Sequence, residues 1–272
     1  MHLTNQPALH RQESHGPPTA FAEHGLFSQK LASNVEAAVL RGHVDDDFTP
    51  TLPDDLVYLA LSNKVELAVR DRLSYLLHQK LGAKRFVVRE WPLTDDSTTG
   101  RRVDFGVAAA HPIGETPPAL LTLTHAFELK SVYSFDIDEE SKRKCVELKE
   151  LAVAVGTIRQ ERSMHNDAKL FSLLTVTHIE CEKEAPALQL VMRSYRARVR
   201  NICAVKWDPI TRFNPTTRYE EACLEQNVDV PLLLCARDCS SNQKIHGARV
   251  SLGYWLYQHS TPSNPRPDQH EG

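Results

Sequence analysis

The chain has 272 residues, of which 41% are apolar and 25% are charged, and its formal net charge is −3. This composition is typical of a globular protein with a sizeable core, and the negative charge argues against a protein that coats DNA with its whole surface. No segment approaches the ~18 uninterrupted apolar residues that a membrane span needs, and residues 1–20 lack the apolar segment of a signal peptide. We therefore expect a cytoplasmic protein, or a nuclear one in a eukaryote, with no membrane partner.

The cysteines are scattered along the chain, and only the pair Cys235 and Cys239 is close in sequence. A disulfide scaffold needs a denser pattern, and a zinc site needs a second pair of ligands that is missing here. We therefore expect free, mostly buried thiols. The set comprises Cys145, Cys181, Cys203, Cys223, Cys235 and Cys239.

The sequence predicts one domain between two tails. Residues 1–24 are polar, contain prolines and lack periodicity, which is typical of a disordered tail, and residues 261–272 are similar. Between them we expect a single domain over residues 25–260, with a core over about 55–180 and a C-terminal extension over 186–260.

Helical patterns fill the first part of this domain. Apolar residues at helical spacing predict a short helix within residues 27–41, and Pro53-Asp54-Asp55 has the form of a helix start. A longer apolar stripe then runs from Val65 to Leu81 and ends at Gly82. Glu66 lies on the border of this stripe, where it could form a capping box with Asn63 and pair with Arg70.

Three strands are expected next. Residues 85–93 read as a short strand, and the apolar runs 103–110 and 120–132 flank a Pro- and Gly-containing insert, which predicts a hairpin. Side chains two apart share a face of a strand, so Glu128 and Lys130 project together while Leu129 points away.

Asp104 stands between Val103 and Phe105, where apolar neighbours favour burial, and a buried carboxylate needs a partner. A divalent cation is one such partner. The carboxylates of Asp104 and Glu128 and the main-chain carbonyl of Leu129 suit a hard ion such as Mg²⁺, with water in the remaining positions. Lys130 would then lie beside the bound water.

A crossover follows the hairpin. The spacing of apolar residues predicts a helix over 139–155 that ends at Gly156, and the apolar run 170–179 predicts a strand buried on both faces. Residues 159–169 between them are polar and favour a solvated loop, in which His165 and Lys169 could instead touch substrate. Such a crossover makes the strands that it joins parallel.

The order of Asp104 and then Glu128-Leu129-Lys130 on the next strand resembles the PD-(D/E)xK signature of the restriction-endonuclease-like nucleases, over roughly residues 62–179. The resemblance implies an α/β fold with an αβββαβ core and a central mixed sheet, extended here by N-terminal helices and C-terminal strands. It also implies Mg²⁺, or Mn²⁺ in its place, held by Asp104, Glu128 and the Leu129 carbonyl.

In this family the lysine helps to position or deprotonate the attacking water, a role that falls on Lys130. A glutamate on the helix before the first core strand is usually aimed at the metal, and Glu66 occupies the matching place. The chain departs from the signature in one respect, because Arg102-Val103 stands where a proline precedes the first aspartate. The long insert before Glu128 leaves the register of the two strands open.

Two features of the C-terminal third bear on partners. A helix opening at Pro186 carries Arg193, Arg196 and Arg200 toward one side, which is either a phosphate-facing surface or a solvated helix face. Strands expected over 228–236 and 249–258 could extend the sheet or form an edge that pairs two protomers into a homodimer.

These observations predict metal-dependent hydrolysis of phosphodiester bonds in nucleic acid, with DNA as the expected substrate. The alternative is a catalytically inactive module of the same fold, in which Asp104, Glu128 and Lys130 form an internal ion-paired cluster and the surface binds nucleic acid or a protein. A hydrolase acting on another substrate lacks a nucleophile, because no serine or cysteine lies in a recognisable elbow or beside a paired histidine motif.

Overall fold

The structure is a computed structural model, and it describes the residues 54–62, 65–81, 85–93, 101–111, 120–138, 145–160, 164–181, 205–241, 244 and 247–260. The helix expected within 27–41, both tails and the helix expected after Pro186 lie outside these residues. No helix within the described ranges has the length and apolar character needed to cross a bilayer.

A mixed sheet of six strands forms the centre of the molecule, in the order β1-β2-β3-β4-β6-β5. The β3–β4 pair is parallel and the other neighbouring pairs are antiparallel. The strands are β1 (Arg85–Pro92), β2 (Arg102–His111), β3 (Leu120–Tyr133), β4 (Met164–Cys181), β5 (Leu232–Ser240) and β6 (Ala248–His259). The helices are α2 (Asp54–Ser62), α3 (Glu66–Lys80), α4 (Ser134–Ile137), α5 (Val146–Arg159) and α8 (Thr216–Glu225).

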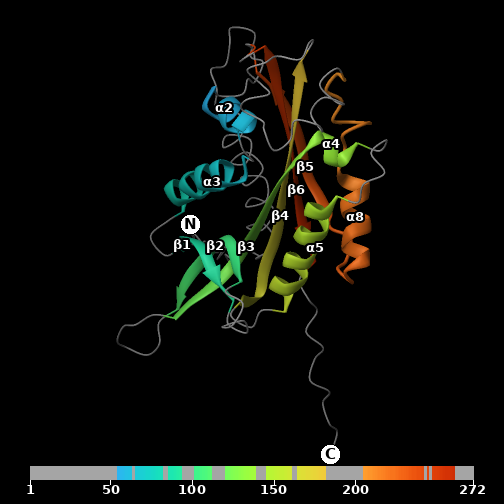
Figure 1. The fold of residues 1–272 in the computed structure, drawn as a ribbon. Coiled ribbons are helices and arrows are strands. Elements are labelled where there is room, and N and C mark those ends of the chain that lie inside the picture. The colour runs from blue at the N-terminus through green and yellow to red at the C-terminus, as the bar shows by residue number, and fades with distance from the viewer. Residues whose placement is uncertain are drawn as a thin grey trace, which may run out of the picture.

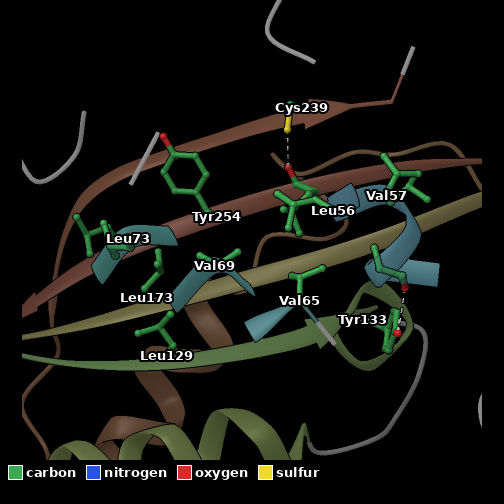
Figure 2. Close-up of a cluster of buried hydrophobic side chains, with 14 of the residues drawn as sticks. Leu56, Val57, Val65, Val69, Leu73, Leu129, Tyr133, Leu173, Cys239 and Tyr254 are labelled. Carbon is green, nitrogen blue, oxygen red and sulfur yellow. Dashed lines mark hydrogen bonds between the residues drawn. The ribbon is translucent and has the colours of Figure 1, made fainter. Parts of the chain in front are cut away.

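Helices cover both faces of the sheet, with α2 and α3 on one side and α5 and α8 on the other (Figure 1). Because side chains alternate along a strand, β3 supplies Leu129 to the core under α2 and α3 and Val132 to the core under α5. Figure 2 shows the first of these cores, where Val69 and Leu73 of α3 lie against the side chains of the sheet. Each face thus has its own hydrophobic core.

Three phenylalanines stack across the middle of the sheet. The ring centroids of Phe105 and Phe127 are 4.4 Å apart, and those of Phe127 and Phe171 are 5.0 Å apart. Phe105 and Phe127 are also paired in register on β2 and β3. Since Asp104 and Glu128 are the next residues along these two strands, the aromatic stack fixes the position of both carboxylates.

Gly106 makes the close approach of β2 and β3 possible beside this stack. A Cβ atom at this position would lie 2.8 Å from the backbone oxygen of His125 and 2.5 Å from Cδ2 of Leu123. The Leu123 side chain can move, but the backbone cannot. We therefore expect Gly106→Ala to lower the free energy of unfolding by about 1–3 kcal/mol, measured by urea denaturation. Ala109→Val, at a partly exposed position of the same strand, should change it far less, and equal effects would contradict this account.

The predicted hairpin, the strand over 85–93 and the parallel crossover are all confirmed. Both C-terminal strands are present with shifted bounds, and they extend the sheet, with β6 between β4 and β5. Pairing of two protomers through the β5 edge stays a prediction. Of the described cysteines, only Cys235 is partly exposed and the others are buried, which confirms the expectation of mostly buried thiols.

Two expectations about individual elements were wrong, and one helix was not expected. Helix α5 does not end at Gly156 but continues to Arg159. Gly156 instead permits close packing, because a Cβ there would lie 3.2 Å from Cγ2 of Val228. Strand β4 begins at Met164, inside the polar segment expected to be a loop. Helix α8 was not expected, although its buried Tyr219, Ala222 and Cys223 follow helical spacing.

A buried histidine joins α8 to the sheet. The Nε2 of His259 on β6 lies 2.9 Å from the Ser172 hydroxyl of β4, and the Tyr219 hydroxyl of α8 donates to Ser172 over the same distance. Burial lowers the pKa of His259 from 6.5 to about 4, and the nearby charge of Arg159 lowers it further while Asp229 opposes the shift. The imidazole is therefore neutral in the folded protein at neutral pH.

This histidine should make the fold less stable in mild acid. Between pH 6.5 and about 4 the unfolded chain binds a proton at His259 that the folded chain does not. The free energy of unfolding therefore has its full value above this pH range and decreases as the pH falls through it. We expect this group to account for a loss of about 3 kcal/mol in the free energy of unfolding. Urea denaturation across the window should show the decline in the wild type and a weaker one in His259→Gln. Parallel curves for the two proteins would contradict the prediction.

Candidate functional site

The candidate site lies where β2 and β3 separate. Their ladder ends at the pair Phe105 and Phe127, whereas β3 continues to Tyr133 and β2 runs back to Arg102 paired with β1. The edge of β3 that faces β2 therefore has no strand partner in this ladder beyond Phe127. The backbone N–H groups on this edge therefore need hydrogen-bond acceptors other than a neighbouring strand.

Two carboxylates satisfy these N–H groups. The backbone N–H of Leu129 donates to Oδ2 of Asp104 over 2.7 Å, and that of Ser131 donates to Oε2 of Glu66 over 2.9 Å. Asp104 comes from the start of β2 and Glu66 from the first turn of α3. The fork between the strands thus brings together acids that are 38 positions apart in the sequence.

The role of Glu66 differs from the capping box that the sequence favoured. Helix α3 has Val65 as its N-cap residue and no side-chain cap hydrogen bond, so Glu66 is not the third residue of a capping box as predicted. Asn63, the other member of that box, lies outside the described residues. The carboxylate turns to the sheet because the Ser131 N–H there needs an acceptor. Arg70 forms ion pairs with Asp71 at 3.1 Å and with Glu90 at 3.3 Å.

Glu128 carries an unsatisfied oxygen. Its Oε2 atom is buried and has no hydrogen-bond partner within the described part of the chain. Burial raises the pKa of Glu128 well above its usual value, the charge of Asp104 raises it further, and a hydrogen bond from the Asp104 backbone N–H opposes the shift. A buried carboxylate oxygen without a donor is costly, so this atom requires either a proton or a cation.

Asp104 is shifted in the same direction. Burial raises its pKa from 3.8 to about 6, and the charge of Glu66 adds to this, while the Leu129 N–H and the charges of Arg70 and Lys130 act against it. Its pKa is raised even though Lys130 and Arg70 are close. Burial of the Asp104 carboxylate, together with the charge of Glu66, therefore outweighs the effect of these two cations on its pKa.

Lys130 extends from β3 beside these acids. Its Nζ lies 2.8 Å from Oε2 of Glu150 on α5. Burial alone would lower the pKa of Lys130, but the hydrogen bond to Glu150 and the charges of Glu66, Glu150 and Glu128 outweigh it and raise the pKa. The amine is therefore a fixed cation at neutral pH. Glu150 was missed by the sequence analysis, since nothing in a helix pattern says which polar residue meets a given strand.

The donor set is suited to a hard divalent cation. Within the described residues, no group of three or more His, Cys, Asp and Glu side chains is arranged to hold a metal ion. Two carboxylates remain, those of Asp104 and Glu128. The N–H and C=O of one strand residue point to the same side, so the Leu129 carbonyl faces the same side as its N–H, which meets Asp104. Mg²⁺ is commonly held by one or two carboxylates with several waters, which these residues fit.

The predicted phosphate-facing arginines Arg193, Arg196 and Arg200 lie outside the described residues. Comparisons with protein-family models, with curated proteins and with solved structures find no match for this chain.

Proposed function

We propose that this chain is a metal-dependent nuclease of the PD-(D/E)xK type, which hydrolyses phosphodiester bonds in nucleic acid, with DNA as the expected substrate. The order of α3, three strands, α5 and β4 supports the restriction-endonuclease-like αβββαβ core. The observation that carries the proposal is the buried Glu128 Oε2, which has no donor in the described chain and lies beside the carboxylate of Asp104.

Asp104, Glu128 and the Leu129 carbonyl would hold Mg²⁺ or Mn²⁺. When bound, the ion polarises a phosphoryl oxygen and stabilises the negative charge of the leaving oxygen. The orientation of the Asp104 carboxylate is fixed in advance by the Leu129 N–H, and the stack of Phe105 on Phe127 holds the two strands together. Such preorganisation avoids rearrangement during the reaction.

Lys130 supplies the positive charge of the protein itself. Its ammonium group can donate a hydrogen bond to the attacking water and neutralise charge that develops on the phosphate. Glu150 fixes the position of this amine, and the Ser131 N–H fixes that of Glu66. Each of these side chains is thus held by a partner before substrate arrives.

A catalytically inactive binding module is the second candidate, and the ion pair of Lys130 with Glu150 favours it, because a structural cluster also pairs its lysine. The two candidates differ in metal binding. A metal site raises the melting temperature when Mg²⁺ or Mn²⁺ is added, because the ion binds the folded state alone. A module with an internal polar cluster shows no such rise.

The activity is tested with supercoiled plasmid, linear duplex, single-stranded DNA and RNA, each with Mg²⁺, Mn²⁺ or EDTA. We expect cleavage that requires the metal and disappears in Asp104→Ala. Glu221→Ala, which removes an exposed acid on α8, should cleave as the wild type does. Absence of cleavage from all four substrates, together with no metal-induced rise in melting temperature, would contradict the proposal.

A further inference from the structure

A cavity of about 460 Å³ lies beside the acid pair, and Glu128 is one of its lining residues. The other walls are formed by α5, by Leu93 after the end of β1, and by Arg101 and Arg102 at the start of β2. A cavity of this size is in the range that binds small organic ligands. Because Glu128 belongs both to the acid pair and to the cavity, a ligand in the cavity lies next to the proposed reaction centre.

We infer, on the basis of the proposed function, that this cavity binds one unpaired nucleotide of the substrate next to the scissile phosphate. The protein would then cleave single-stranded nucleic acid, or a nucleotide that has left its duplex, in preference to intact duplex. The charges and the apolar wall of the cavity support this inference independently.

The charged part of the cavity is mostly basic. Arg101, Arg102 and Lys149 contribute to its lining, against the acids Glu128 and Glu150. Arg102 forms an ion pair with Glu90 at 2.9 Å, and Lys149 forms one with Glu225 on α8, so each of these cations is held by a partner. An arginine has five N–H donors and retains several for a phosphate when one is engaged. These residues can therefore bind the phosphates on either side of an unpaired nucleotide.

The remaining wall is aliphatic and partly open to solvent. Val146 and Val153 on α5 lie in the lining and are 58% and 41% exposed, unusually high for apolar side chains of a helix that also packs on a sheet. Ala154 and Ile158 continue this wall. A nucleobase presents a flat, weakly polar face that such a wall can cover, and the guanidinium planes of the arginines can stack on it.

A paired base cannot use this wall. In a duplex the faces of the bases are covered by their neighbours and only the edges and the phosphates are accessible. A base must leave the stack to enter an enclosed pocket, which costs least where it is already unpaired. A duplex would thus engage the basic residues alone, whereas an unpaired nucleotide engages both the basic residues and the aliphatic wall.

The first test measures binding without catalysis. A deoxynucleoside 5′-monophosphate and inorganic phosphate are titrated in EDTA and followed by NMR. We expect the nucleotide to bind more tightly than phosphate, and Ala154→Phe, which fills the cavity, to weaken nucleotide binding about tenfold or more. Val153→Glu changes an exposed position, so it should fold, and its carboxylate should have the same effect. Ala236→Phe, at an exposed site on β5, is the matched control.

The second test compares cleavage of single-stranded and duplex oligonucleotides of one sequence with Mg²⁺. We expect the wild type to prefer the single strand, and both cavity variants to lose this preference while keeping the rise in melting temperature with Mg²⁺. Nucleotide binding no tighter than phosphate, or unchanged binding in both variants, would overturn the inference even if metal-dependent cleavage is present. If the wild type neither binds Mg²⁺ nor cleaves nucleic acid, the proposed function itself would be overturned.

Discussion

Replacing Lys130 with Met is expected to lower the rate of metal-dependent cleavage by about 10²–10³-fold, because it removes a preorganised positive charge from the reaction centre. Methionine has nearly the length of lysine, and the lost ion pair involves an exposed Glu150, which contributes little to stability. The fold should therefore persist. Initial rates on the best substrate, circular dichroism and the melting temperature with and without Mg²⁺ measure the three effects separately.

The control for this variant is Lys206→Met, which removes an exposed lysine that lies outside the site. Its rate should equal that of the wild type. If Lys130→Met cleaves at the wild-type rate, Lys130 has no part in the reaction, and the assignment of this motif to a nuclease site is wrong. A loss of cleavage accompanied by unfolding would be resolved by repeating the assay with Glu150→Gln, which leaves Lys130 in place.

Asp104→Asn is expected to abolish cleavage and yet to stabilise the metal-free protein by about 1–2 kcal/mol at neutral pH. The pKa of Asp104 is about 6 in the folded protein and 3.8 ordinarily, so the folded state binds more protons between these values. The stability that Asp104 contributes is thus full below pH 3.8 and is lost as the pH rises through about 6. Asparagine does not titrate and keeps an oxygen for the Leu129 N–H.

The gain should therefore be small near pH 4 and reach its full size above pH 6. Urea denaturation of both proteins in EDTA across this range gives the difference directly, which separates it from the opposite trend of His259. Addition of Mg²⁺ should raise the melting temperature of the wild type but not of the variant. A variant that is less stable at every pH and still responds to Mg²⁺ would show that Asp104 is a structural acceptor only.

The strands that carry the site could be predicted because their pattern is local. Alternating apolar residues on both sides of a turn-rich insert indicate a hairpin, and the spacing of Glu128 and Lys130 places both on one face. The register of β2 and β3, which brings Asp104 beside Glu128, could not be predicted in the same way. It depends on where the β2–β3 ladder ends, which the stacked rings of Phe105 and Phe127 determine.

Three differences from the sequence analysis have a common physical cause, because each concerns a residue whose role is decided by a distant segment. Glu66 has the sequence of a capping residue, but the Ser131 N–H attracts its carboxylate. Gly156 has the sequence of a helix end, but it allows Val228 to approach α5. The partner of Lys130 is Glu150, one of several polar residues on α5, and only the packing of α5 on the sheet selects it. Local propensity contains none of this information.

The position of β6 has a consequence for biosynthesis. This strand pairs with β4 along its whole length and with β5 on its other edge, although it is made after both. While a ribosome is still translating the segment before Ala248, β4 has one open edge and β5 has no neighbour in the sheet. Completion of the sheet must then wait for the emergence of residues 248–259, so we expect late, slow folding and a need for chaperone protection of the nascent chain.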